Sequence, residues 1–234
     1  MAFAKFCNDN ASWLDDYALF MALKNAHNGN VWNTWKKDIA MHDPEAVAYW
    51  RMQLREEVEA QQYYQFQFFR QWFALKRYAN EKGIKIIGDI PIFVAFDSAD
   101  AWANRDLFYI DDAGQPTVVA GVPPDYFSAT GQLWGNPLYN WKKMAGDDYA
   151  WWVARMRSIF AQVDIVRLDQ IRPSVIAMFG QTMDGVRAFW SSIPAANAAT
   201  APECYDFAWA PNPASAFQVT QGHTCLTRLT WNAP

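Results

Sequence analysis

The sequence predicts an α/β fold, and two observations lead to this prediction. Two short runs rich in β-branched residues, Ile84–Ile90 and Val163–Asp169, have the composition of strands buried on both faces. A helical pattern precedes each run, so that helix and strand alternate along the chain. Repeated units of this kind favour a TIM-type (β/α) barrel, although a doubly wound sheet would give the same pattern.

Two helical patterns precede the first run. Between Trp13 and Lys24 apolar residues recur at helical intervals, and Gly29 follows as a stop signal. A second helix is predicted to begin at Asp43, which can cap the free amides, with Pro44 at the first helical position. It extends towards Gly83, and its apolar face is so broad that we expect a break or two helices.

The segment between the two predicted strands is mostly turns. The stretch from Asp111 to Trp141 is rich in turn residues, and a helix is predicted from Asp147 to Gln162. Two acidic pairs are interpreted without a catalytic role: Asp15 and Asp16 as a solvated helix start, and Asp111 and Asp112 as a turn.

Composition points to a neutral partner. Of the 234 residues, 52% are hydrophobic and 17% are aromatic, including 13 Trp, which is more aromatic surface than a core needs and suggests a binding surface. The net charge of -4 provides no field to attract nucleic acid or an acidic membrane.

No cofactor or metal is predicted. The cysteines Cys7, Cys204 and Cys225 lack the paired spacing of a zinc or redox site, and the three histidines lack metal spacing. There is no phosphate-binding or dinucleotide motif. With no basic leader and no run of about 18 apolar residues, the sequence predicts a soluble, cytoplasmic protein.

Strand ends supply the candidate catalytic residues. Arg167 and Asp169 alternate onto one face of the second run, where the guanidinium would lower the pKa of the carboxyl, as a carboxylate nucleophile requires. A structural ion pair would have the same pattern. Asp89 closes the first run and could line the same pocket, or could instead form a turn or cap.

The loop from Gly121 to Pro137 combines aromatic and hydrogen-bonding residues. Aromatic rings can stack on the flat faces of sugar rings while polar groups bind the hydroxyls, and the alternative is a structural loop whose rings pack inward. The candidate binding residues are Asp125, Tyr126, Phe127, Gln132, Trp134 and Asn136.

Three segments in order, Trp13–Phe20, Gly88–Ala95 and Asp97–Asn104, together with the stretch Gly121–Trp141, resemble the amylomaltase family of 4-alpha-glucanotransferases, over about residues 3 to 172. The resemblance implies a barrel of the alpha-amylase clan that transfers segments of maltodextrin, an alpha-1,4-glucan, by a retaining double displacement. It further implies that Asp169 is the nucleophile, Arg167 its electrostatic partner, Asp89 a donor-subsite residue, and the loop part of the glucan-binding surface.

After Asp169 the sequence departs from the family's pattern. The family has Asp-His-Phe-Arg-Gly where this chain has Asp169-Gln170-Ile171-Arg172-Pro173, and the later acidic residues do not lie in the family's Glu-Asp-Leu-Gly setting. Family chains are about twice as long, so we expect a chain truncated at both ends. Residues 1–173 would form a partial catalytic barrel and residues 174–234 a divergent, poorly ordered tail.

Three functions stay open. The first is glucan transfer, impaired by the truncation. The second is binding of maltodextrin without catalysis, and the third is hydrolysis of alpha-glucans. Missing strands would also leave sheet edges and apolar helix faces exposed, which predicts possible self-association.

Overall fold

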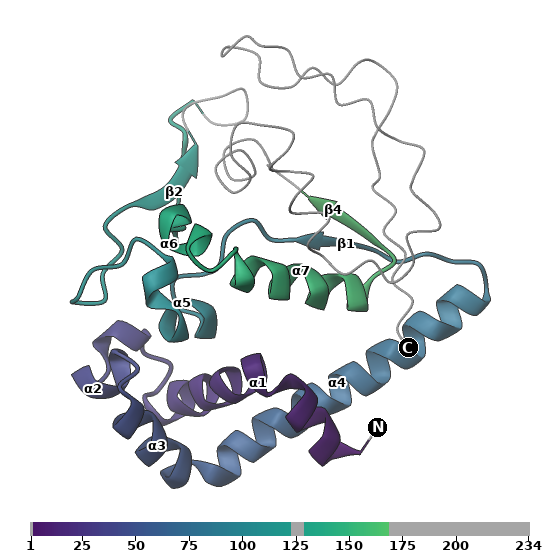
Figure 1. Cartoon of the computed structure of the whole chain (residues 1–234), viewed down its shortest axis with the longest axis horizontal. Coiled ribbons are helices and arrows are strands. Elements are labelled where there is room, and N and C mark those ends of the chain that lie inside the picture. The colour runs from purple at the N-terminus through teal and green to yellow at the C-terminus, as the bar shows by residue number, and fades with distance from the viewer. Residues whose placement is uncertain (1, 123–128, 169–234) are drawn as a thin grey trace. The chain divides into compact units, whose positions relative to one another are not determined.

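The structure is a computed structural model that describes residues 2–122 and 129–168 (Figure 1). It forms two compact units, each built from two separate stretches of the chain. The first unit contains the chain up to Trp72 together with Phe93–Lys143, and the second contains Phe73–Ile92 and, among the described residues, 144–168. The predicted tail, 174–234, lies outside the described residues.

Helices occupy most of the first half of the described chain, and short strands appear in the second half (Figure 1). In chain order the elements are α1 (Phe3–Ala26), η1 (Trp32–Thr34), α2 (Lys37–Ala40), α3 (Pro44–Gln53), α4 (Arg55–Glu81), β1 (Ile87–Ile90), α5 (Ala99–Ala103), η2 (Arg105–Leu107), β2 (Val119–Val122), β3 (Gln132–Pro137), α6 (Trp141–Ala145), α7 (Ala150–Gln162) and β4 (Ile165–Leu168).

Helix α1 is longer than the sequence pattern predicts. It begins at Phe3 rather than near Trp13, because the rings of Phe3 and Phe6 pack on Phe66 of α4 at centroid distances of 5.6 and 5.7 Å. Burial of these rings stabilises a turn that the local pattern alone does not specify.

The pair Asp15 and Asp16 lies in the middle of α1, so its interpretation as a solvated helix start is wrong. Asp15 accepts hydrogen bonds from Arg51 of α3 and Gln62 of α4 at 3.4 and 3.3 Å. Asp16 lies 3.3 Å from Nε2 of His42. The two carboxylates therefore join α1 to the segments packed around it.

The predicted start of the second helix is confirmed. The Asp43 carboxylate accepts hydrogen bonds from the backbone N–H groups of Glu45 and Ala46, and Pro44 is the first residue of α3. The predicted break is confirmed as well, because α3 ends at Gln53 and α4 begins at Arg55.

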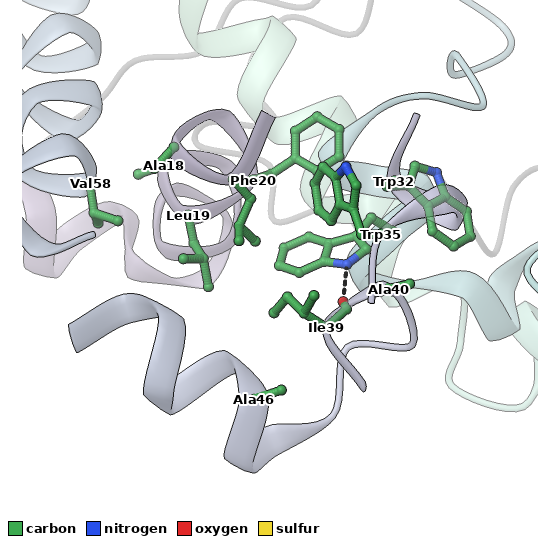
Figure 2. Close-up of a cluster of buried hydrophobic side chains, with 12 residues drawn as sticks. Ala18, Leu19, Phe20, Trp32, Trp35, Ile39, Ala40, Ala46 and Val58 are labelled. Atoms are coloured by element: carbon green, nitrogen blue, oxygen red, sulfur yellow. Dashed lines mark hydrogen bonds between the residues drawn. The ribbon is translucent and has the colours of Figure 1, made fainter. Parts of the chain in front are cut away.

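The core of the first unit is rich in tryptophan (Figure 2). Trp32 and Trp102 are 0% exposed and Trp35 is 6% exposed. The indole N–H of Trp102 donates to the carbonyl oxygen of Ile39 at 2.8 Å, so burial leaves that donor paired. These three tryptophans thus belong to the core, whereas the composition had suggested a binding surface for the surplus aromatic residues.

The second unit contains a parallel pair of strands. Strand β1 pairs with β4 in the register Ile87 to Ile165 and Asp89 to Arg167, and α7 leads directly into β4. The predicted helix before this strand begins at Ala150 rather than Asp147. Parallel pairing confirms the βα organisation that the two runs predicted.

The expectation that the first run is buried on both faces is wrong. Ile90 is buried, but Ile84 is 59% exposed and Ile87 is 57% exposed. Within the described residues β1 has a single neighbouring strand, β4, and its other edge pairs with no strand. The exposed apolar side chains lie before β1 and at its first residue, so burial is confined to the end of the strand at Ile90.

The side chain of Asp164 accepts hydrogen bonds at the start of the β1–β4 sheet. Its Oδ2 accepts hydrogen bonds from the backbone N–H of Ile86 at 2.9 Å and from the side chain of Asn80 at 2.8 Å. Burial raises the pKa of Asp164, but these two hydrogen bonds and the charges of Lys76 and Lys85 outweigh it and hold the pKa below its ordinary value.

We expect Asp164→Ala to lower the free energy of unfolding by about 1–3 kcal/mol at pH 7, because it leaves the backbone N–H of Ile86 without its acceptor and the Asn80 amide with only the carbonyl oxygen of Ile84. A carboxyl whose pKa is depressed in the folded state stabilises that state above its unfolded pKa, and the contribution is lost as the pH falls through the folded pKa. The difference in the free energy of unfolding between the wild type and Asp164→Asn should therefore be largest above about pH 5 and should shrink below about pH 4. Urea unfolding at pH 7 and pH 3 measures this difference, and a pH-independent difference would contradict it.

The stretch from Asp111 to Trp141 contains two strands where the sequence predicted mainly turns. Strands β2 and β3 are antiparallel, with Val122 opposite Gln132. A Cβ on Gly121 would meet the carbonyl oxygen of Gln132 at 2.7 Å, so the backbones approach more closely than a side chain permits. The glycines and prolines of this stretch give it the sequence pattern of turns. Strands form there nevertheless, because cross-strand pairing contributes more to such a ladder than local propensity does.

No helix among the described residues is long and apolar enough to cross a membrane.

Candidate functional site

Asp89 and Arg167 form a two-point ion pair across the parallel strands of the second unit. Arg167 Nε donates to Asp89 Oδ1 at 2.8 Å, and Nη2 donates to Oδ2 at 2.7 Å. The two residues are direct partners in the β1–β4 register, so their side chains project from the same face of the sheet. The strand pairing therefore sets this geometry.

This ion pair is exposed to solvent, with side-chain exposures of 57% for Arg167 and 52% for Asp89. Exposed pairs contribute only about 0–1 kcal/mol to stability, so folding gives little reason for it. Its chemical effect is to orient a carboxylate and a guanidinium on an accessible face at the end of two parallel strands, where barrel enzymes place reactive groups.

Among the described residues, Arg167 pairs with Asp89. Asp169, the predicted nucleophile, lies outside the described residues, so its predicted pairing with Arg167 stays a prediction. Asp89 and Arg167 are 78 positions apart, so strand alternation within one run could not bring them together.

Arg155 of α7 supports the same strand end, and sequence reasoning missed it. Its Nη2 donates to the carbonyl oxygen of Pro91 at 2.9 Å, and its guanidinium carbon lies 5.3 and 5.8 Å from the ring centroids of Trp151 and Trp152. Stacking on two rings restricts the guanidinium. The available signal was the Trp151-Trp152 pair followed by an arginine one helical turn later.

Strand β3 of the first unit carries three of the predicted binding residues. The indole N–H of Trp134 donates to Gln132 Oε1 at 3.1 Å, and the Trp134 ring lies 6.2 Å from the ring of Phe93. Asn136 Nδ2 donates to the carbonyl oxygen of Val94 at 2.8 Å. The structure thus brings together Gln132 and Trp134, and it ties Asn136 to the loop that follows β1.

The remaining predicted binding residues, Asp125, Tyr126 and Phe127, lie outside the described residues. In the part of the chain that is described, no three His, Cys, Asp or Glu side chains gather as a metal site. A surface cavity of about 450 Å³ in the first unit is lined by residues around Trp35 and Met41, and no predicted site residue lines it.

A parallel strand pair preceded by a helix, with charged residues at the strand ends, places the second unit in the α/β class, to which the (β/α) barrels belong. The family model described as 4-alpha-glucanotransferase matches residues 1–176. The chain therefore belongs to this family.

Individual relatives agree with the family match. A 4-alpha-glucanotransferase of Synechocystis is 53% identical over 171 residues, which cover 73% of this chain and 34% of the relative. One from Thermus thermophilus is 44% identical over 212 residues, covering 91% of this chain and 39% of the relative. The chain thus spans little more than a third of the length of the curated relatives it matches.

A solved structure gives the fold. The amylomaltase from Streptococcus agalactiae in complex with acarbose matches with a TM-score of 0.69 and 41% identity, over 72% of this chain and 34% of that one. The chain therefore has a partial TIM-type barrel of the amylomaltase kind, with inserted helical and loop segments, as its sequence predicted.

Proposed function

We propose that this chain carries part of a 4-alpha-glucanotransferase site that transfers alpha-1,4-glucan segments between maltodextrins. The observation that carries the proposal is the family match over residues 1–176, which includes both strand ends and the Gly121–Pro137 loop. The relatives bear that enzyme's name, and the amylomaltase structure holds acarbose.

The proposed reaction is a retaining double displacement. The Asp169 carboxylate attacks the anomeric carbon, the glycosidic C–O bond breaks, and the leaving oxygen takes a proton from a general acid. The 4-hydroxyl of an acceptor sugar then attacks the same carbon, releases its proton to the conjugate base and frees Asp169. The second carboxyl group must lie about 5 Å from the first, and we assign it to no residue of this chain.

The other predicted residues have supporting roles in this proposal. Arg167 provides positive charge beside the intermediate and orients Asp89, which contacts the donor sugar. Trp134 stacks on a sugar ring while Gln132 and Asn136 bind hydroxyls. We propose a sugar-binding role for Asp125, Tyr126 and Phe127 as well, which lie outside the described residues. Residues 1–173 would be the catalytic part and 174–234 a separate tail.

We further propose that this chain self-associates and that it is a cytoplasmic protein. Ile84 and Ile87 at the edge of β1, and Tyr64 and Tyr78 on α4, are more than half exposed, which favours self-association. Cys7 is a free thiol in the structure, which fits the reducing cytoplasm.

Incubation of the purified chain with maltotriose tests the main proposal. We expect glucose and maltodextrins longer than maltotriose, resolved by chromatography, and we expect both to disappear in Asp169→Asn because the nucleophile is lost. Calorimetric titration with acarbose measures binding in the same samples.

The outcomes separate the three open functions. Longer products that depend on Asp169 establish transfer, whereas shorter sugars alone indicate hydrolysis. Acarbose binding without products indicates a binding protein. A folded chain with neither binding nor products would contradict the proposal.

A further inference from the structure

We propose that Lys24, at the end of α1, is a positioning residue for the glucan-binding face of β3, through the loop that follows β1. This inference rests on the proposed function, because it takes Trp134 and Asn136 as sugar-binding residues. All groups involved belong to the first unit. The loop, residues 93–98, connects these residues to α1 and η1.

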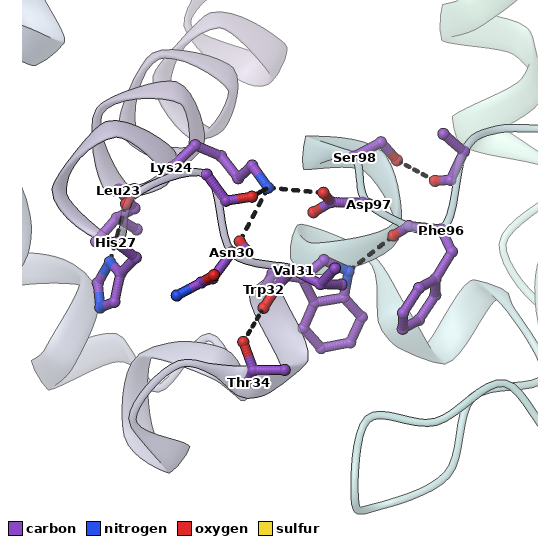
Figure 3. Close-up of polar contacts among 12 residues, drawn as sticks. Leu23, Lys24, His27, Asn30, Val31, Trp32, Thr34, Phe96, Asp97 and Ser98 are labelled. Atoms are coloured by element: carbon purple, nitrogen blue, oxygen red, sulfur yellow. Dashed lines mark hydrogen bonds and ion pairs between the residues drawn. The ribbon is translucent and has the colours of Figure 1, made fainter.

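Lys24 forms a part-buried ion pair with this loop (Figure 3). Its ammonium lies 2.6 Å from Asp97 Oδ2, and the side chains of Lys24 and Asp97 are only 16% and 33% exposed. The same ammonium donates to the carbonyl oxygens of Gly29 and Asn30, so the turn after α1 holds it in place. Shielded charges and shared hydrogen bonds make this pair stronger than an exposed one.

Two further hydrogen bonds immobilise the loop. The indole N–H of Trp32, a fully buried residue, donates to the carbonyl oxygen of Phe96 at 2.7 Å, and the two rings lie 5.1 Å apart (Figure 3). Ser98 Oγ donates to the carbonyl oxygen of Ala95 at 2.6 Å. The loop backbone is thus fixed from α1 and η1 on one side.

The beginning of the loop contacts β3. The carbonyl oxygen of Val94 accepts the hydrogen bond from Asn136, and the ring of Phe93 lies against the ring of Trp134. A shift of the Phe93–Ser98 backbone would therefore move the acceptor of Asn136 and the support of Trp134. Lys24 does not touch the predicted sugar face, so any effect on sugar binding must pass through this loop.

Lys24 provides the positive charge that pairs with Asp97. Oδ1 of Asp97 is buried and has no hydrogen-bond partner in the described structure, so Lys24 supplies the counter-charge of a carboxylate that is partly shielded from water. Removing the ammonium would leave Asp97 without its ion-pair partner, and a shift of the loop that brings water to the buried Oδ1 would then be favoured.

Three variants and one control test the proposal in the whole chain. Lys24→Met removes the charge and keeps the side-chain length, Lys24→Arg restores a cation, and Asp97→Asn removes the partner. Lys36→Met is the control, because it removes a lysine whose ion pair with Asp38 is exposed in the same unit. Acarbose affinity by calorimetry and hydrogen exchange of peptides covering residues 93–98 and 132–137 are measured well below the Tm of the least stable variant.

We expect Lys24→Met and Asp97→Asn to weaken acarbose binding by about tenfold or more, as small displacements of binding groups do, and to accelerate exchange at 132–137. Lys24→Arg should retain most of the acarbose affinity and of the protection from exchange at 132–137. Lys36→Met should change neither the affinity nor the exchange. A lower Tm with unchanged affinity and unchanged exchange at 132–137 would reduce Lys24 to a structural residue and overturn the inference. If the wild-type chain neither binds acarbose nor forms products from maltotriose, the proposed function fails. Whenever acarbose binding is absent, exchange at 132–137 alone decides the positioning: faster exchange supports it and unchanged exchange overturns it.

Discussion

Arg167→Met is expected to lower the rate of glucan transfer by about 100- to 1,000-fold, the range seen when a preorganised charged or hydrogen-bonding group is removed from a reacting centre. The variant removes both hydrogen bonds to Asp89, and with them the orientation of that carboxylate. Because the pair is exposed, the free energy of unfolding should change by no more than about 1 kcal/mol. Activity and stability should therefore separate clearly.

Two companion variants sharpen this test. Lys at position 167 keeps the charge but cannot donate two parallel hydrogen bonds to one carboxylate, so Arg167→Lys should recover only a small part of the activity. Arg157→Met removes an exposed guanidinium from α7 in the same unit and should have little effect. Transfer is followed with maltotriose, and acarbose affinity provides a second measurement. Equal effects of Arg167→Met and Arg157→Met on both measurements would contradict a special role for Arg167.

Trp102→Ala is expected to cost about 3–5 kcal/mol in the free energy of unfolding, the usual range for a large aromatic side chain removed from a core. The Trp102 ring is 0% exposed and lies 5.8 Å from the ring of Phe20, 6.1 Å from that of Trp35 and 4.5 Å from that of His42. The variant leaves a cavity among these rings and removes the indole donor to the carbonyl oxygen of Ile39, which keeps the backbone N–H of His42 at 3.1 Å.

A graded series separates volume from hydrogen bonding. Trp102→Phe keeps an aromatic ring and loses one of the two donors to the Ile39 carbonyl oxygen, so it should cost less than Trp102→Ala, with about 0.5–1.5 kcal/mol from the lost hydrogen bond. Tyr64→Ala, at a side chain that is 60% exposed, should change stability by no more than about 0.5 kcal/mol. Urea unfolding followed by circular dichroism measures all three. A cost for Trp102→Ala close to that of Tyr64→Ala would mean that the tryptophan cluster does not form the core in solution.

Structural features were predicted correctly where the residues that form them lie in one short segment of the chain. Asp43 caps amides two and three residues ahead of it, so Asp43 followed by Pro44 is enough to place the start of α3. The runs around Ile87 and Ile165 likewise have the composition of strands, and they pair in parallel. In both cases the information is local, or depends only on the burial of one face.

Longer-range features were missed for one physical reason. The start of α1 depends on Phe66 of α4, and β2 and β3 depend on a close backbone approach at Gly121. Neither leaves a periodic pattern in its own segment, because cross-strand pairs and ring packing join residues from distant positions.

The sequence by itself determined the family, the α/β class and the identity of the candidate groups, because motifs and periodicity are properties of neighbouring residues. Tertiary structure alone decided which of these groups meet. It paired Arg167 with Asp89 across 78 positions and Lys24 with Asp97 across 73, and it placed Trp32 and Trp102 in the core. Side-chain partners of this kind are set by strand register and helix packing, which no local pattern specifies.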